Sequence, residues 1–292
     1  MRAFALFITL MATAVVGGAL LAFPAYSLAH DLGADWPFHR VANRLAMLVL
    51  LAGLIWMLRR MGLANRVAMG YGAPRGQFLS LAARALAIGA LLMAPVIAML
   101  LLLDLREAKA DLTTATIVTV ALKGLIGGVV VAFIEETFFR GAMHTAIERE
   151  SGTGTAVALT ALVYAGVHFL NRVRIPHESV DWGSGFELMA RTFSAFGDPL
   201  RIADSFLALF AVGVLLGLVR LRYGHIAACV GLHAGWVCVI ALARDLTVRA
   251  PDGAASFLVG SYDGVIGYLV LGWTLVLIAV FAAVRRRRQL AG

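Results

Sequence analysis

Residues 3–29 read AFALFITLMATAVVGGALLAFPAYSLA and contain no charged side chain. A helix of this length, rising about 1.5 Å per residue, is long enough to cross the hydrocarbon core of a bilayer, which is about 30 Å thick. The apolar segment of a secretory signal is usually only about 7–15 residues long. We therefore interpret residues 3–29 as a retained membrane-spanning helix.

The composition extends this interpretation to the whole chain of 292 residues. Hydrophobic residues make up 61% and charged residues 14%, against about 45–50% and about 25% in ordinary soluble domains. So few charged side chains cannot cover a water-facing surface, which excludes a soluble globular protein and, with it, a nucleic-acid binder. Further apolar runs occur at 41–58, 78–103, 120–144, 154–170, 205–221, 223–243 and 262–284. We predict an all-α, polytopic protein of the lipid bilayer, with about eight transmembrane helices in a single integral-membrane domain over residues 1–292.

Basic residues predict the orientation of these helices. The net charge is +8, and lysine and arginine accumulate in cytoplasmic loops. The sharpest mark is the cluster RRRR at 285–288, directly after an apolar run. An even number of spans places both termini on one side, so both are predicted to be cytoplasmic. Arg220 and Arg222 are interpreted in the same way, as interfacial residues just before the span at 223–243.

Two adjacent carboxylates, Glu135 and Glu136, interrupt the apolar run at 129–139. A charged side chain at the centre of a bilayer costs at least about 2.5–3.5 kcal/mol, so this pair needs a reason. Arg140 follows Glu136 by four residues, which places both on one helix face where they can pair. Glu135, about 100° further round the helix, would face elsewhere. An ion pair at the membrane interface, without any chemistry, is the alternative interpretation.

Two histidines are expected at the depth of these carboxylates. The stretch SGTG at 151–154 predicts a turn between two apolar helices. Residues equally far from 152 on the two arms then lie level, and Glu136 and His168 are such a pair. His233 lies on a third span, about 15 Å from its cytoplasmic start by the helical rise. A single histidine in a membrane is more often a hydrogen-bonded link between helices, but two of them level with paired carboxylates favour a catalytic site.

Three motifs within residues 135–237 resemble the CPBP family of CAAX proteases and bacteriocin-processing enzymes, also called the ABI family, which includes the Ras-converting CAAX prenyl endopeptidase. The stretch EETFFR at 135–140 fits the family pattern EExxxR. YAGVH at 164–168 is similar to the second pattern, FxxxH, with tyrosine in place of phenylalanine. HAGWV at 233–237 resembles the third motif, in which Asn or Asp stands four residues after the histidine, where this chain has Val237.

The resemblance implies an intramembrane endopeptidase of the glutamate type. Glu135 would be the general base on a water held with His168, and His233 would help to stabilise the oxyanion. Glu136, which belongs to the same catalytic set, and Arg140 would orient Glu135. The implied substrate is a peptide or membrane protein cleaved near the membrane, CAAX-like in the narrowest form. The implied location is a bacterial inner membrane.

Val237 leaves this site without one hydrogen-bond donor that the family motif supplies. Losing a donor to the oxyanion costs about 10²–10³ in rate. Tyr164 and Trp236 are the candidates within the motifs that could contact the oxyanion or the substrate instead.

No metal cofactor is expected, but zinc is a chemically sound alternative. Two histidines and a carboxylate with an open position for water form a known zinc arrangement, here Glu135, His168 and His233. We favour metal-free catalysis, because Glu135 used as a ligand would leave only Glu136, tied to Arg140, as the base. Two other functions stay open: a transporter that relays protons through the same groups, and a non-catalytic scaffold that binds membrane peptides.

Overall fold

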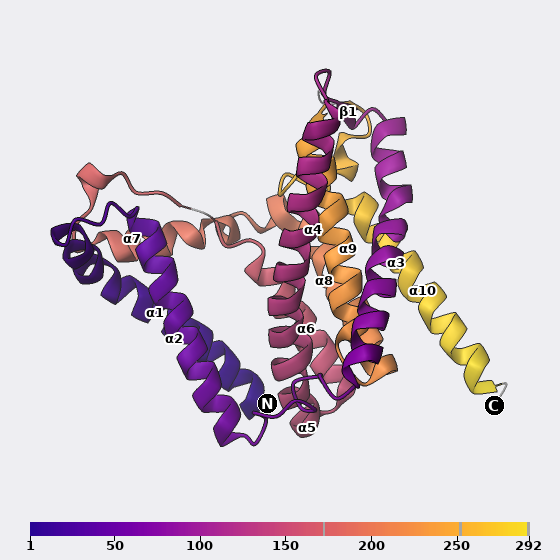
Figure 1. The fold of residues 1–292 in the computed structure, drawn as a ribbon, viewed down its shortest axis with the longest axis horizontal. Helices are drawn as coiled ribbons and strands as arrows, with labels where there is room; N and C mark the ends of the chain where they lie inside the picture. Colours follow the sequence, from indigo (N-terminus) through magenta and orange to yellow (C-terminus); the bar gives the residue numbers. More distant parts are fainter. Residues whose placement is uncertain (172, 251–252, 291–292) are drawn as a thin grey trace. The chain divides into compact units, whose positions relative to one another are not determined.

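The computed structural model describes residues 1–171, 173–250 and 253–290 (Figure 1). Its regular elements are almost all helical, which confirms the predicted all-α fold. The α-helices in these ranges are α1 (Arg2–Asp31), α2 (Phe38–Arg60), α3 (Arg75–Leu102), α4 (Thr114–Glu136), α5 (His144–Ser151), α6 (Thr153–Val167), α7 (Ser184–Thr192), α8 (Pro199–Tyr223), α9 (Ala227–Leu246) and α10 (Tyr268–Leu290).

The predicted membrane spans correspond to helices. Six segments in the described ranges are long and apolar enough to cross a membrane: Arg2–Asp31, Phe38–Arg60, Arg75–Leu102, Thr114–Ser151, Pro199–Tyr223 and Ala227–Leu246. α6 and the part of α10 from Tyr268 to Val284 are apolar but shorter. The protein is therefore a multi-pass membrane protein, whereas the exact count of eight spans and the cytoplasmic position of both termini stay predictions.

The turn predicted at 151–154 is present. α5 ends at Ser151, Gly152 adopts a φ of +82°, and α6 begins at Thr153. Glycine reaches a positive φ at little cost because it has no Cβ. α6 returns beside the segment that precedes α5, since the ring of Tyr164 on α6 contacts Arg140.

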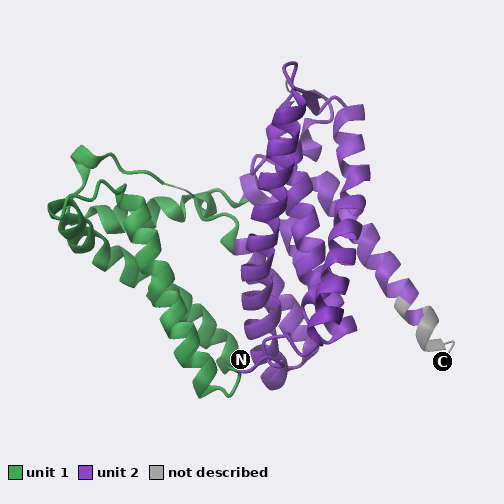
Figure 2. Cartoon of the chain, viewed as in Figure 1, with its two compact units in different colours: residues 1–64, 167–199 green, residues 65–166, 200–292 purple. Residues whose placement is uncertain are grey.

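The described chain forms two compact units (Figure 2). Unit 1 consists of residues 1–64 and 167–199 and contains α1, α2 and α7. These helices line a mostly apolar cavity of about 450 Å³. Unit 2 consists of residues 65–166 and the described residues from 200 onward, and it contains the other helices. That the two units belong to a single integral-membrane domain stays a prediction.

α9 packs against both α3 and α4 in unit 2. Small residues permit this packing, because backbone occupies the space that side chains would need. The carbonyl oxygen of Leu86 on α3 lies 2.4 Å from the position of a Cβ on Gly235, and that of Ala234 lies 2.7 Å from the position of a Cβ on Gly128 of α4. His233, which directly precedes Ala234 on α9, is thereby held against α4.

Two three-residue strands join the loops at one end of unit 2. β1 (Arg106–Ala108) and β2 (Thr247–Arg249) are antiparallel, with Glu107 opposite Val248. The buried side chain of Arg106 donates hydrogen bonds to Thr247 and to the carbonyl of Gly264. The loop before α4 is thus tied to the loop after α9.

Candidate active site

Both glutamates lie where the helix geometry changes. α4 ends at Glu136, and Thr137–Met143 form a π-helical segment, η1, before α5 begins at His144. π-helical turns are rare and frequently occur at functional sites. The sequence predicts one regular helix over 120–144, because its composition carries no signal for the wider turn.

The predicted pair of Glu136 and Arg140 is confirmed. Arg140 Nη1 donates to Glu136 Oε1 at 2.9 Å, and both side chains are fully buried. Arg140 Nη2 donates to the carbonyl of Gly213 on α8 at 3.1 Å. These bonds keep Glu136 in one orientation. Removing either partner of the pair would leave an uncompensated charge in the protein interior.

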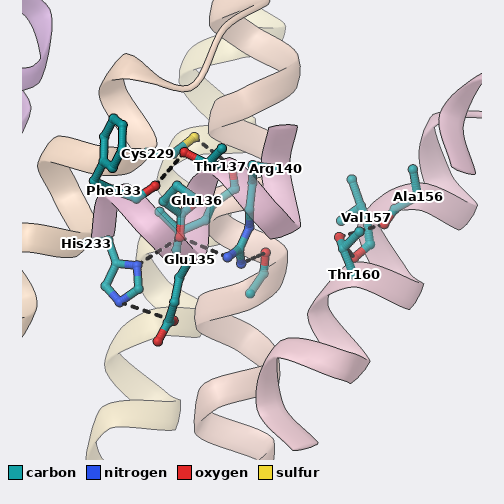
Figure 3. A network of polar contacts seen from close by, with 12 residues as sticks. Phe133, Glu135, Glu136, Thr137, Arg140, Ala156, Val157, Thr160, Cys229 and His233 are labelled. Atoms are coloured by element: carbon teal, nitrogen blue, oxygen red, sulfur yellow. Dashed lines mark hydrogen bonds and ion pairs between the residues drawn. The ribbon is translucent and has the colours of Figure 1, made fainter. Parts of the chain in front are cut away.

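His233 reaches the same carboxylate from α9. Its Nδ1 lies 2.8 Å from Glu136 Oε1, and its side chain is buried. A carboxylate paired with arginine is ionised and only accepts hydrogen bonds, so Nδ1 carries the proton and donates. Nε2 faces Glu135 Oε2 at 3.9 Å (Figure 3). The imidazole therefore lies between the two carboxylates, hydrogen-bonded to Glu136 and facing Glu135.

Glu135 differs from Glu136 in its surroundings. Its side chain is 27% exposed, against 0% for Glu136. Glu135 Oε2, Glu136 Oε2 and Arg140 Nε are buried atoms without a hydrogen-bond partner among the described residues. Buried polar atoms are normally paired with protein groups or ordered water. The cluster thus has acceptor atoms available for a further group, and Glu135 is its more accessible carboxylate.

Tyr164, one of the two predicted oxyanion or substrate contacts, adjoins this cluster. The guanidinium carbon of Arg140 lies 4.5 Å from the centre of its buried ring, and the ring of His233 lies 5.8 Å from it. Tyr164 also interacts electrostatically with Glu135. Tyr164 and Arg140 are equally far from Gly152 in the sequence, so they lie level as the hairpin predicts.

The remaining motif residues have different positions. His168 follows α6 directly and belongs to unit 1, so its participation stays a prediction. Trp236 is buried on α9. Val237 lies one turn after His233, and its Cβ is 3.5 Å from the position of a Cβ on Gly128 of α4. The contact of α4 with α9 therefore includes the position at which the family motif has Asn or Asp.

A loop of unit 2 that the sequence did not single out also contacts η1. The Thr137 hydroxyl donates to the carbonyl of Phe133, and the phenol of Tyr71 donates in turn to Thr137. Burial raises the pKa of Tyr71 above its ordinary value of 10.0, so the phenol keeps this proton at neutral pH. Tyr71 stands in GYGAP at 70–74, a stretch that indicates a turn but no partner.

Arg220, which was predicted at the membrane interface, lies inside unit 2 in the last turn of α8, and its depth in the membrane stays a prediction. Its side chain is buried, and its Nε donates to the carbonyl of Arg140 at 3.1 Å. A buried guanidinium is tolerated where acceptors meet its protons. The backbone of η1 supplies such an acceptor, and no pattern in the sequence predicted this contact.

The zinc alternative requires enough donor atoms at this site. A catalytic zinc usually has three protein ligands. Glu135 and His233 face each other and could supply two, and Glu136, whose Oε1 accepts from Arg140 and His233, has a second oxygen without a partner among the described residues. Among the residues that the structure describes, no three His, Cys, Asp or Glu side chains are positioned to hold a metal ion. Zinc therefore stays an alternative, with His168 as the predicted third ligand.

Comparisons with known proteins agree with the motifs. Residues 117–239 match the family described as type II CAAX prenyl endopeptidase Rce1-like, which confirms the resemblance found in the sequence. The matched range extends from α4 to α9 and contains Glu135, Glu136, Arg140, Tyr164, His168 and His233. No curated protein and no solved structure matched the chain. Because the matched family is one of proteases, the match supports peptidase activity in a membrane protein.

Proposed function

Because residues 117–239 match the type II CAAX prenyl endopeptidases, we propose that this protein is an intramembrane endopeptidase with Glu135 as its general base. Its substrate is a peptide or membrane-anchored protein, CAAX-like in the narrowest form, which it cleaves near the membrane. The observation that carries this proposal is the buried cluster of Glu136, Arg140 and His233, beside which Glu135 is the partly exposed carboxylate.

In this proposal, Glu135 activates a water molecule. Its Oε2 atom is 3.9 Å from His233 Nε2, too far for a direct hydrogen bond, but one water oxygen can lie about 2.8 Å from both atoms. In the proposed reaction, Glu135 takes a proton from this water while the oxygen attacks the scissile carbonyl. Glu135 then gives the proton to the leaving amine as the peptide bond breaks. His168 would be a further contact of the water.

Glu136 and Arg140 act in this proposal through His233, whereas the motif alone suggested that they orient Glu135. The hydrogen bond from His233 Nδ1 to Glu136 holds the ring in one orientation and one tautomer. Arg140 balances the charge of Glu136. Nε2 is then the one nitrogen of His233 left for the water or, when protonated, for the developing oxyanion.

Tyr164 supports the cluster from the α6 side. Its ring lies against the Arg140 guanidinium and close to His233, so it excludes solvent from the charged pair and strengthens the pair's electrostatic interaction. Its hydroxyl could reach the substrate as the donor that Val237 cannot supply. Tyr164→Phe should then lower turnover while the folded protein is retained.

The test is a comparison of peptide termini in cells that produce the wild type or Glu135→Gln. The glutamine keeps the shape of the side chain but cannot accept a proton, so we expect normal folding and complete loss of the protein-dependent termini. Glu187→Gln on α7 is the matched control, because Glu187 is an exposed acid paired with Arg191. Termini that persist in cells with Glu135→Gln would exclude Glu135 as the base.

Purified protein and the identified substrate then separate the alternatives. We expect cleavage to be insensitive to chelators, and a loss that added Zn²⁺ reverses would assign a zinc enzyme instead. A wild-type protein that retains the peptide uncut in all conditions would be a scaffold. Proton flux in proteoliposomes that Glu135→Gln abolishes, without any cleavage, would identify a transporter.

A further inference from the structure

The loop between α2 and α3 contains a cavity outside the catalytic cluster. The cavity has a volume of about 480 Å³ and is lined by residues 66–67 and 71–75. This volume lies within the range of about 300–1,000 Å³ that is typical of small-molecule sites. All lining residues belong to unit 2 and to one short stretch of chain, so the cavity is formed locally.

The cavity is cationic and has no acidic residue in its lining. Arg66 and Arg75 are both exposed, and neither guanidinium has a hydrogen bond or an ion pair to any residue in the described ranges. The sequence contains no aspartate or glutamate from residue 36 to residue 103. Guanidinium groups bind phosphate through paired N–H donors, so two unpaired arginines in one cavity favour a phosphate-bearing ligand.

The position of the cavity favours a lipid over a soluble anion. Arg75 is the first residue of α3, which is long and apolar enough to cross a membrane. The end of such a helix lies at the level of the lipid headgroups. Val67, also in the lining, is 71% exposed. An exposed apolar side chain beside two cations suits a ligand that carries both a phosphate and acyl chains.

We propose that residues 66–75 bind the phosphate of an anionic phospholipid between Arg66 and Arg75. Tyr71 forms part of the cavity wall while its hydroxyl donates to Thr137 in η1. The carbonyl of Gly70 accepts a hydrogen bond from the amide of Ile226, just before α9, at 3.0 Å.

The bound lipid is thereby coupled to the catalytic cluster. The loop contacts η1, which contains Arg140, and the start of α9, which carries His233. A lipid that orders residues 66–75 therefore also restrains these two segments. The importance of that restraint for catalysis rests on the proposed function, whereas lipid binding does not.

Binding is tested on the purified full chain in detergent. The protein is titrated with phosphatidylglycerol, phosphatidylcholine or inorganic phosphate, and retained lipid is measured by native mass spectrometry. We expect preference for phosphatidylglycerol and a loss of affinity of about 25-fold in Arg66→Gln/Arg75→Gln, about fivefold for each arginine. The control Arg149→Gln/Arg222→Gln removes the same charge from exposed positions on α5 and α8 and should change the affinity by less than about twofold.

Three results would overturn the lipid site: equal retention of both lipids, an equal loss in both double variants, or displacement of phosphatidylglycerol by inorganic phosphate at similar concentration. Glu135→Gln should bind phosphatidylglycerol like the wild type, so failure of the peptidase assignment leaves this test intact.

The coupling is measured by amide hydrogen exchange across 137–143. Phosphatidylglycerol should slow exchange in the wild type but not in Tyr71→Phe, which keeps both arginines and loses the hydrogen bond to Thr137. Exchange that does not respond to the lipid in the wild type would overturn the coupling.

Discussion

Two buried arginines of unit 2, Arg106 and Arg140, satisfy their charge in different ways. Arg106 donates from Nε to Thr247 Oγ1, from Nη1 to the carbonyl of Gly264, and from Nη2 to the carbonyl of Thr247. Asp263 adds a favourable charge near it. Arg140 pairs with Glu136 through Nη1, while its Nε has no partner in the described part of the chain.

This difference separates a structural arginine from one at a candidate site. All three nitrogens of Arg106 have acceptors, and these acceptors tie the loop before α4 to the loop after α9. The cluster around Arg140 instead keeps buried carboxylate oxygens without a partner. Unsatisfied buried polar atoms are costly, and the proposed catalytic water would supply a partner to those of this cluster.

Replacing Arg140 should cause the largest loss of stability. In Arg140→Ala, Glu136 remains buried without its cation, which should lower the free energy of unfolding by about 3–5 kcal/mol. Arg140→Ala/Glu136→Gln should recover much of this loss. Unfolding of the single and double variants in detergent measures both effects, and a double variant no more stable than Arg140→Ala would show that the two residues are not energetic partners.

Installing a donor beside the cluster should raise turnover. Val237→Asn places an amide one turn from His233, and if the enzyme lacks one oxyanion donor, turnover should rise by up to about 10²-fold, or about 2.7 kcal/mol. Val237→Ala, which adds no donor, should leave turnover nearly unchanged. An unchanged rate in Val237→Asn would mean that another group, with Tyr164 as the first candidate, already supplies the donor.

Arg106→Ala should affect stability alone. Hydrogen bonds to charged groups contribute about 1.5–3 kcal/mol, so we expect a loss of about 2 kcal/mol in the free energy of unfolding. Cleavage per folded molecule should stay at the wild-type level. Arg244→Ala, at an exposed position of α9, should have no measurable effect on stability. A specific loss of turnover in Arg106→Ala would contradict the contrast with Arg140.

The smallest expected effect concerns pH and His225, near the Arg220 that contacts the carbonyl of Arg140. Burial and the charge of Arg220 lower the pKa of His225 below its ordinary value of 6.5. The folded state therefore favours neutral His225, whose Nδ1 accepts from the amide of Ala227 at 3.4 Å. The contribution of neutral His225 to the free energy of unfolding is complete above about pH 6.5. It is lost as the pH falls through the pKa of His225 in the folded protein. Thermal unfolding between pH 7.5 and pH 5 should show a smaller decline in His225→Asn, and identical declines would refute the assignment.

Much of the local geometry of the site was predictable from spacing. Glu136 and Arg140 are four residues apart, so one helix face brings them together whatever the rest of the chain does. Gly152 marked the reversal that sets Tyr164 level with Arg140. The depth of His233 followed from counting residues along its span, and its contact with Glu136 agrees with that count.

Contacts between distant segments without a motif were not predictable. Tyr71 and Thr137 are 66 residues apart, and Arg220 and Arg140 are 80 apart. Tyr71 sits in a stretch that signals only a turn, and Arg220 in a stretch that favours an interface. The local pattern predicted an ordinary α-helix over residues 137–143, whereas η1 is π-helical and contacts both Tyr71 and Arg220.

By itself, the sequence determined the membrane class, the helices, the reversal at Gly152 and the pairing of Glu136 with Arg140. These depend on the cost of transferring residues into lipid and on contacts within one or two helical turns. Only the tertiary structure decided that Glu136 is the fully buried carboxylate and that His233 turns Nδ1 toward it and Nε2 toward Glu135. Those outcomes depend on how far each helix is rotated and how closely α9 approaches α4, which is settled by packing across the whole of unit 2.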